Sequence, residues 1–243
     1  MNYSNNFKKL TELNTFLGTG NPNSKILIVG KEVATDTEEG TNKELENKNI
    51  ESFNNNCSDW LKNIDKNISQ NQINNWDFKQ NNNNPLYAFK GLSINIEGHT
   101  WRKYQKLNNY IFDKINNTEI NFQEEFFITE MSTLPSKTTG KAIAKKDFKE
   151  KMKLRKDTFF KSDFIQEFPI VILACSNYIT GEEITDIFKV DFIKELGDTT
   201  QKYWIHYNSN KTKLVIHTRQ LSANVSDKLL NDIANEVKKI LVK

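Results

Sequence analysis

The sequence KILIVGKE at residues 25–32 decides the fold of this chain. One lysine precedes a short run of branched apolar residues, and the run ends at Gly30 and two charged side chains. A continuous apolar run of this length is typical of a β-strand buried on both faces, as in a parallel sheet covered by helices. We therefore predict a parallel strand at 25–30 whose carboxyl end presents Lys31 and Glu32.

Three other segments repeat this pattern, namely FFITE (126–130), IVILAC (170–175) and KLVIH (213–217). Apolar residues recur at helical spacing between or after them, at 100–115, 183–196 and 226–241. The last helix should begin at a Ser226 or Asp227 cap. Strands that alternate with helices imply right-handed crossovers. The predicted fold is α/β, a three-layer α/β/α domain with a small, mostly parallel four-stranded central sheet.

The whole chain, 1–243, is expected to form a single domain. Residues 36–86 are polar and rich in asparagine, which predicts a helical insertion after the first strand, with Ile68, Ile73 and Trp76 among its few apolar residues. Cys57 and Cys175 are far apart and too few to hold an iron–sulfur cluster, so we expect neither a metal nor a cofactor. The sequence contains no signal-peptide pattern and no membrane-spanning run, and we expect a cytoplasmic monomer without membrane contacts.

The net charge of +3 is too small to identify a nucleic-acid-binding protein by itself. Basic residues are nevertheless concentrated at 145–156, where a helix would separate a basic side from an apolar side. The basic side would carry Lys145, Lys149, Lys153 and Lys156, and the apolar side Phe148, Met152 and Phe159. The segment is either a solvated amphipathic helix or a surface that follows phosphate groups.

Polar side chains follow the predicted strands at the edge where ligands bind in open parallel sheets. Glu32, Glu130 and His217 each end a strand, so two carboxylates and an imidazole should converge. A serine hydrolase would need the pattern Gly-x-Ser-x-Gly, which is absent. The glycines of LGTGNPNSK (17–25) precede the strand, whereas a phosphate-binding loop should follow it. Hydrolysis that uses a carboxylate and a histidine remains.

On these residues the chain resembles the uracil-DNA glycosylase superfamily, whose chemistry lies on loops after the first and last strands of a small parallel sheet. The family motif Gly-Gln-Asp-Pro-Tyr-His corresponds to GKEVAT at 30–35, and His-Pro-Ser-Pro-Leu-Ser corresponds to HTRQLS at 217–222. The histidine, leucine and serine of the second motif keep their register. The resemblance covers roughly 18–243, with 36–86 outside it.

The resemblance implies a role for each matching residue. Glu32 would act on water and His217 would assist the leaving base, while Phe89 stacks on the extruded base and Glu130 reads it. Leu221 would be exposed and would fill the gap in the duplex. The DNA itself would be held by Arg219, Gln220, Ser222, Lys31, Lys141 and Lys145.

Two departures from the family pattern bear on the substrate. Glu130 stands where the family has an asparagine. An ionised glutamate accepts hydrogen bonds but cannot donate them, which disfavours uracil and suits the exocyclic amine of cytosine. Ala34 replaces the tyrosine that closes the pocket against groups on the pyrimidine C5 atom. Together they predict a monofunctional DNA glycosylase for C5-substituted cytosine, such as the bases with which some phages protect their DNA, and hence a role in antiviral defence.

Other interpretations stay open at this point. The chain could be a catalytically silent DNA-binding module of the same fold, a repair enzyme that excises uracil, or a small-molecule hydrolase. Glu32 could pair with Lys31, Glu130 could pair with an arginine, and Phe89 and His217 could be core residues.

Overall fold

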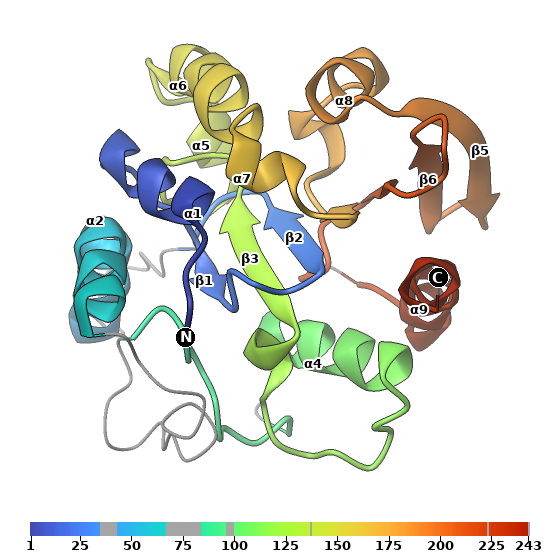
Figure 1. The fold of residues 1–243 in the computed structure, drawn as a ribbon, viewed down its shortest axis with the longest axis horizontal. Coiled ribbons are helices and arrows are strands. Elements are labelled where there is room, and N and C mark those ends of the chain that lie inside the picture. The colour runs from blue at the N-terminus through green and yellow to red at the C-terminus, as the bar shows by residue number, and fades with distance from the viewer. Residues whose placement is uncertain (35–42, 67–83, 96–99, 137, 223, 243) are drawn as a thin grey trace.

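The computed structural model describes residues 1–34, 43–66, 84–95, 100–136, 138–222 and 224–242 (Figure 1). Its α-helices are α1 (Asn5–Leu10), α2 (Lys43–Lys66), α4 (Thr100–Ile111), α5 (Thr139–Ile143), α6 (Phe148–Arg155), α7 (Asp163–Gln166), α8 (Gly181–Phe188) and α9 (Asp227–Leu241). Its strands are β1 (Thr19–Gly20), β2 (Ile26–Gly30), β3 (Phe126–Glu130), β4 (Ile170–Leu173), β5 (Asp191–Gly197), β6 (Lys202–Tyr207) and β7 (Leu214–Thr218).

Within the described residues, seven strands form one sheet in the order β1-β3-β2-β4-β7-β6-β5. The four predicted strands are its adjacent central members and run parallel, with Val29 paired with Thr129 and Leu173, and Leu173 paired with His217. The prediction of a four-stranded sheet was wrong, because β1, β6 and β5 extend the sheet in antiparallel pairing. The mixed α/β class and the parallel centre are confirmed.

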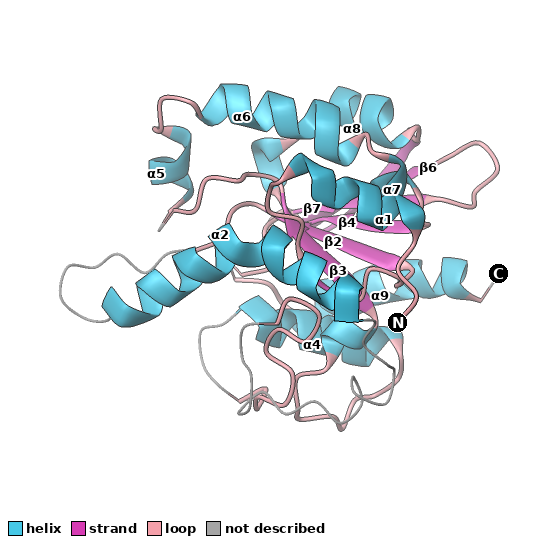
Figure 2. Ribbon diagram, turned by 60° about the vertical axis from the view of Figure 1, so that its left-hand side comes forward, coloured by secondary structure: helices cyan, strands magenta, loops and turns pink. Residues whose placement is uncertain are grey.

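Helices cover both faces of the sheet, with α4 and α9 on one side and α1, α6 and α8 on the other (Figures 1 and 2). Residues of β2 alternate between the two: Leu27 and Val29 pack on the α1 side, Ile26 and Ile28 on the α4 side. Each such side chain that leaves water stabilises the fold by about 1.5–3 kcal/mol, which explains why the apolar run predicted this strand well.

The helical part of the predicted insertion belongs to the core. Trp60 of α2 is fully buried, and its indole N–H donates to the carbonyl oxygen of Gly18 at 2.9 Å. The Asn56 side chain binds the backbone of Leu17 and Gly18. The second half of α2 therefore packs in the helical layer on the α1 side, whereas 35–42 and 67–83, with Ile68, Ile73 and Trp76, lie outside the described residues.

The predicted helix at 183–196 was wrong in its second half. The α8 helix ends at Phe188 because Lys189 adopts a left-handed conformation (φ 56°), and β5 follows. Phe192 and Ile193, which completed the helical pattern, are more than half exposed on this edge strand. The helix predicted at 226–241 is confirmed as α9, and the Ser226 hydroxyl caps it by accepting from the Leu229 amide. The helix predicted at 100–115 is confirmed as α4 only as far as Ile111, where the helix ends. None of the described helices is long and apolar enough to cross a membrane.

The ends of β2 and β3 meet in an unusually close contact. Gly30 pairs with Glu130, and the Glu130 side chain lies over the glycine so that a Cβ atom at position 30 would come within 2.1 Å of Glu130 Oε2. Position 30 therefore has to be glycine as long as Glu130 keeps this orientation.

We expect Gly30→Ala to lower the free energy of unfolding by about 1–3 kcal/mol, because the methyl group and the carboxyl group cannot share this space. In a Glu130→Ala background, the same substitution should cost much less. Chemical denaturation of the two single variants and the double variant measures this coupling, with Gly140→Ala as the control because its Cβ would contact nothing within 4 Å. Equal costs in the two backgrounds would contradict the contact.

Candidate active site

Glu32 follows β2 and is only 8% exposed. Its Oε1 atom accepts a hydrogen bond from the Thr139 hydroxyl at 3.1 Å, whereas its Oε2 atom has no partner among the described residues. The Tyr178 hydroxyl faces the same carboxylate, and burial together with the Glu32 charge raises the pKa of Tyr178. Lys31 lies over the Tyr178 ring instead of pairing with Glu32. The site therefore holds one oxygen of Glu32 by a hydrogen bond and leaves the other oxygen buried without a partner among the described residues.

Glu130 ends β3 with a carboxyl group that is unpaired at Oε2 within the described structure. Burial, together with the nearby charge of Glu32, raises the pKa of Glu130 to about 8, although the charge of Arg155 opposes the shift. The group is therefore protonated at neutral pH. A protonated carboxyl group donates and accepts, so it can pair with the edge of cytosine and equally with that of uracil. The preference for cytosine that assumed an ionised Glu130 is thereby removed.

Arg155, which the sequence analysis did not single out, anchors the end of β3. Its side chain is buried; Nε donates to the Glu130 carbonyl oxygen and Nη2 to the Thr129 hydroxyl, both at 2.9 Å. The guanidinium also stacks on Phe159, 3.9 Å from the ring centroid. A signal for it existed, because Arg155 continues the apolar side of α6 defined by Phe148 and Met152, where a charged residue is unexpected.

His217 is the last residue but one of β7, and its Nε2 atom lies 2.7 Å from the carbonyl oxygen of Ser176. A carbonyl oxygen only accepts, so Nε2 carries the proton and donates. Burial lowers the pKa of His217, which keeps the ring neutral at pH 7. The Trp204 ring lies 5.2 Å away. In this structure the N–H group of His217 is thus hydrogen-bonded to the protein backbone.

The turn Ser176–Tyr178 lies between the two predicted catalytic groups. It follows β4, which separates β2 from β7, and it contacts His217 through the Ser176 carbonyl and Glu32 through the Tyr178 hydroxyl. Glu32 and His217 share no hydrogen bond within the described ranges. Ser176 has a φ of 47°, a strained value for a residue other than glycine, and such strain tends to occur at functional sites.

The predicted base-binding residues are arranged as follows. Phe89 packs on the α4 side of the sheet and stacks on Trp101 at 4.1 Å, so one face of its ring is already covered. Burial and the charge of Glu130 raise the pKa of Tyr104 in α4, so Glu130 lies within electrostatic range of the same helical layer. Ala34 is exposed and directly precedes the undescribed residues 35–42.

The expected exposure of Leu221 was wrong. Leu221 is 1% exposed and packs in the core on the α4 side, where it cannot fill a gap in a duplex unless the loop moves. The neighbouring residues also contact the protein: Arg219 donates to the Thr200 carbonyl at 3.1 Å, and the Gln220 amide donates to the Ser176 hydroxyl at 3.3 Å.

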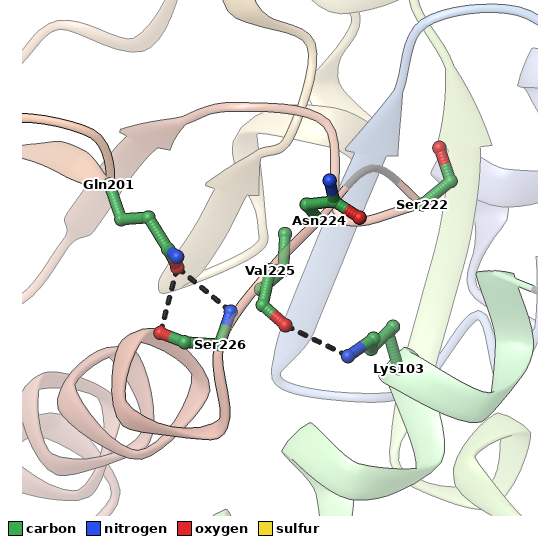
Figure 3. A pocket seen from close by; sticks show the side chains of 6 residues that line it. All are labelled: Lys103, Gln201, Ser222, Asn224, Val225 and Ser226. Atoms are coloured by element: carbon green, nitrogen blue, oxygen red, sulfur yellow. Dashed lines mark hydrogen bonds between the residues drawn. The ribbon is translucent and has the colours of Figure 1, made fainter.

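Ser222 is exposed and lines a shallow, open pocket of about 370 Å³ between α4, the start of α9 and the turn before β6 (Figure 3). Its lining residues are Lys103, Gln201, Ser222, Asn224, Val225 and Ser226. Lys103 donates to the Val225 carbonyl at 2.8 Å, and burial and the charge of Lys106 lower its pKa. The sequence analysis did not include Lys103, although three basic residues fall in the first two turns of α4.

The predicted DNA-binding lysines differ in their accessibility. Lys31 is nearly buried, Lys141 is exposed, and Lys145 donates to the Pro135 carbonyl at 2.5 Å. The apolar side predicted for 145–156 is confirmed, because Phe148, Met152 and Phe159 are buried. On the basic side Lys149 and Lys153 are exposed, but Lys156 pairs with Glu183 at 2.8 Å.

In the part of the chain that the structure describes, no three histidine, cysteine, aspartate or glutamate side chains gather closely enough to hold a metal ion. The chain matches no protein-family model, no curated protein and no solved structure. The chemistry of this site therefore has to be inferred from its own residues.

The raised pKa of Glu130 predicts a pH dependence of stability. The native state keeps the proton up to about pH 8, whereas the unfolded chain loses it near the ordinary value of 4.5. The free energy of unfolding should therefore fall as pH rises between these values, by at most ~1.4 kcal/mol per pH unit for a partly exposed group. Glu130→Gln should flatten this dependence, and urea denaturation from pH 5 to 9 measures it. Glu119→Gln, at an exposed position, is the control; equal slopes in all three proteins would contradict the assignment.

Proposed function

We propose that this chain is a DNA glycosylase that hydrolyses the N-glycosidic bond of a pyrimidine extruded from DNA. The observation that carries the proposal is the pair of carboxyl groups at the carboxyl ends of adjacent parallel strands, the buried Glu32 and the partly buried Glu130. Each has an oxygen without a partner among the described residues, and leaving such atoms unpaired costs about 1–3 kcal/mol. Sites that retain such a cost commonly use the group in binding or catalysis. The resemblance to the uracil-DNA glycosylase superfamily suggests the same two strand ends.

Glu32 would act on the water molecule. Thr139 fixes its Oε1 atom, so the unpaired Oε2 atom is free to accept a hydrogen bond from water and direct it toward the anomeric carbon. The negative charge would also stabilise the cationic sugar that develops as the bond breaks. Breaking the bond leaves the electron pair on the base, and water supplies both the new hydroxyl group of the sugar and the proton that the released base takes up.

His217 would stabilise the departing base. A neutral imidazole donates one hydrogen bond, and this donor is occupied by the Ser176 carbonyl. Catalysis would therefore require the 217–222 loop to rearrange, so that the N–H group moves from Ser176 to an oxygen of the base. The same movement would bring Leu221 out of the core, at the free-energy cost of exposing an apolar side chain.

The substrate would be a pyrimidine with a substituent on C5. Protonated Glu130 pairs with either pyrimidine edge, so the preference now depends on Ala34, whose small and exposed side chain leaves room for the substituent. We therefore propose a C5-substituted pyrimidine, with C5-substituted cytosine and antiviral defence as the case suggested by the resemblance, and excision of uracil as the alternative. Lys103 and Ser222, in the pocket beside the second motif, would contact phosphate groups together with Arg219 and Lys141.

One observation favours a second candidate, a DNA-binding module without catalysis. Both His217 and Leu221 are engaged inside the protein, where neither can act on DNA. A binding module would need no rearrangement of this loop.

The test is release of free base, and formation of alkali-labile sites, from duplexes that carry C5-substituted cytosine, cytosine or uracil. We expect Glu32→Gln and His217→Ala each to slow release about 10²–10⁴-fold, because each loses a group that acts in the transition state. DNA affinity should stay close to that of the unchanged protein, and Glu119→Gln is the matched control.

Undiminished release by Glu32→Gln would refute its catalytic role. Salt-dependent DNA binding without release from any duplex would favour the binding module, and absence of both would refute the DNA proposal.

A further inference from the structure

We infer that Arg155 is the positioning residue for Glu130: its guanidinium group fixes the end of β3 so that the Glu130 carboxyl group stays over Gly30, within electrostatic range of a fixed positive charge. Arg155 comes from the last turn of α6, which is followed by a π-helical turn at Lys156–Phe160. A π turn shifts the direction of the side chains that follow it, and such turns occur frequently at functional sites. Here Phe159 and Phe160, within that turn, both lie beside the guanidinium.

The contacts of Arg155 leave little freedom to the strand end. Nε and Nη2 hold two consecutive residues of β3, one through its backbone carbonyl and one through its hydroxyl group, and Phe159 covers one face of the guanidinium. A lysine could not make both bonds in this geometry, because it lacks the planar, forked set of donors. The Nη1 atom is buried and has no partner among the described residues, so the guanidinium retains a donor near the site.

The charge of Arg155 acts on the same group. Four titratable side chains from different elements are electrostatically coupled to Glu130, namely Glu32, Tyr104, Arg155 and Cys175. Burial lowers the pKa of Arg155 and the charge of Glu130 raises it, but a guanidinium stays protonated at neutral pH. Arg155 is therefore the one cation of this group, and it limits how far burial and Glu32 raise the pKa of Glu130.

Only the consequence of this inference, that Glu130 recognises a base, rests on the proposed function. Its test is NMR spectroscopy of the unchanged protein with labelled arginine and glutamate side chains. The Nε resonance of Arg155 should shift with the same pH midpoint as the Glu130 carboxyl carbon, and this response should disappear in Glu130→Gln. An Nε resonance that does not respond to the Glu130 titration would overturn the inference.

A second arm uses Arg155→Met, which removes the charge and both bonds. The pH midpoint of the Glu130 titration should rise by about one unit, which is a tenfold change in proton affinity. The control variant Lys153→Met, at an exposed position, should leave this midpoint unchanged. A folded Arg155→Met protein with the original midpoint would also overturn the inference. If the variant does not fold, the first arm still decides. Neither arm requires base release, so an inactive protein would refute the proposed function alone.

Discussion

The contact on which the site depends is that of the Glu130 carboxyl group with Gly30. It exists because the parallel register of β2 and β3 sets residues 30 and 130 side by side, and because a glycine leaves the space that the carboxyl group fills. Glu32, two residues further along the chain, adds a second carboxyl group to the same edge. Neither side chain has hydrogen-bond partners for both of its oxygen atoms within the described residues. The fold therefore bears the free-energy cost of removing these polar groups from water.

Arg155 and the turn Ser176–Tyr178 complete this arrangement from the α1 side of the sheet. Arg155 binds the end of β3, and the turn lies between Glu32 and His217 and contacts both. A ligand that displaced the Ser176 carbonyl from His217 would therefore also affect the turn that contacts Glu32. The described structure has the imidazole and Leu221 turned toward the protein, which is the conformation expected before DNA binds if the proposed function is correct.

Much of the fold could be predicted from the sequence because its central strands are buried on both faces, which gives continuous apolar runs. The sequence did not separate α8 from β5, because Phe192 and Ile193 are apolar yet exposed, and the left-handed residue that divides the two elements is a lysine. The strands β6 and β1 were missed for similar reasons, since β6 mixes aromatic with polar residues and β1 spans only Thr19–Gly20. The positions of Glu32, Glu130 and His217 at strand ends followed from the rule for parallel sheets. The protonation of Glu130, the role of Arg155 and the burial of Leu221 did not, because they depend on contacts between residues far apart in sequence.

In this interpretation a carboxylic acid, kept protonated by its surroundings, lies at the shared end of β2 and β3. Infrared spectroscopy tests this directly, because the carbonyl stretch of a protonated carboxyl group is separate from the bands of a carboxylate. We expect such a band at pH 7 that is absent in the Glu130→Gln variant and fades as the pH rises through about 8. Its absence at pH 7, or its persistence in the variant, would contradict the account.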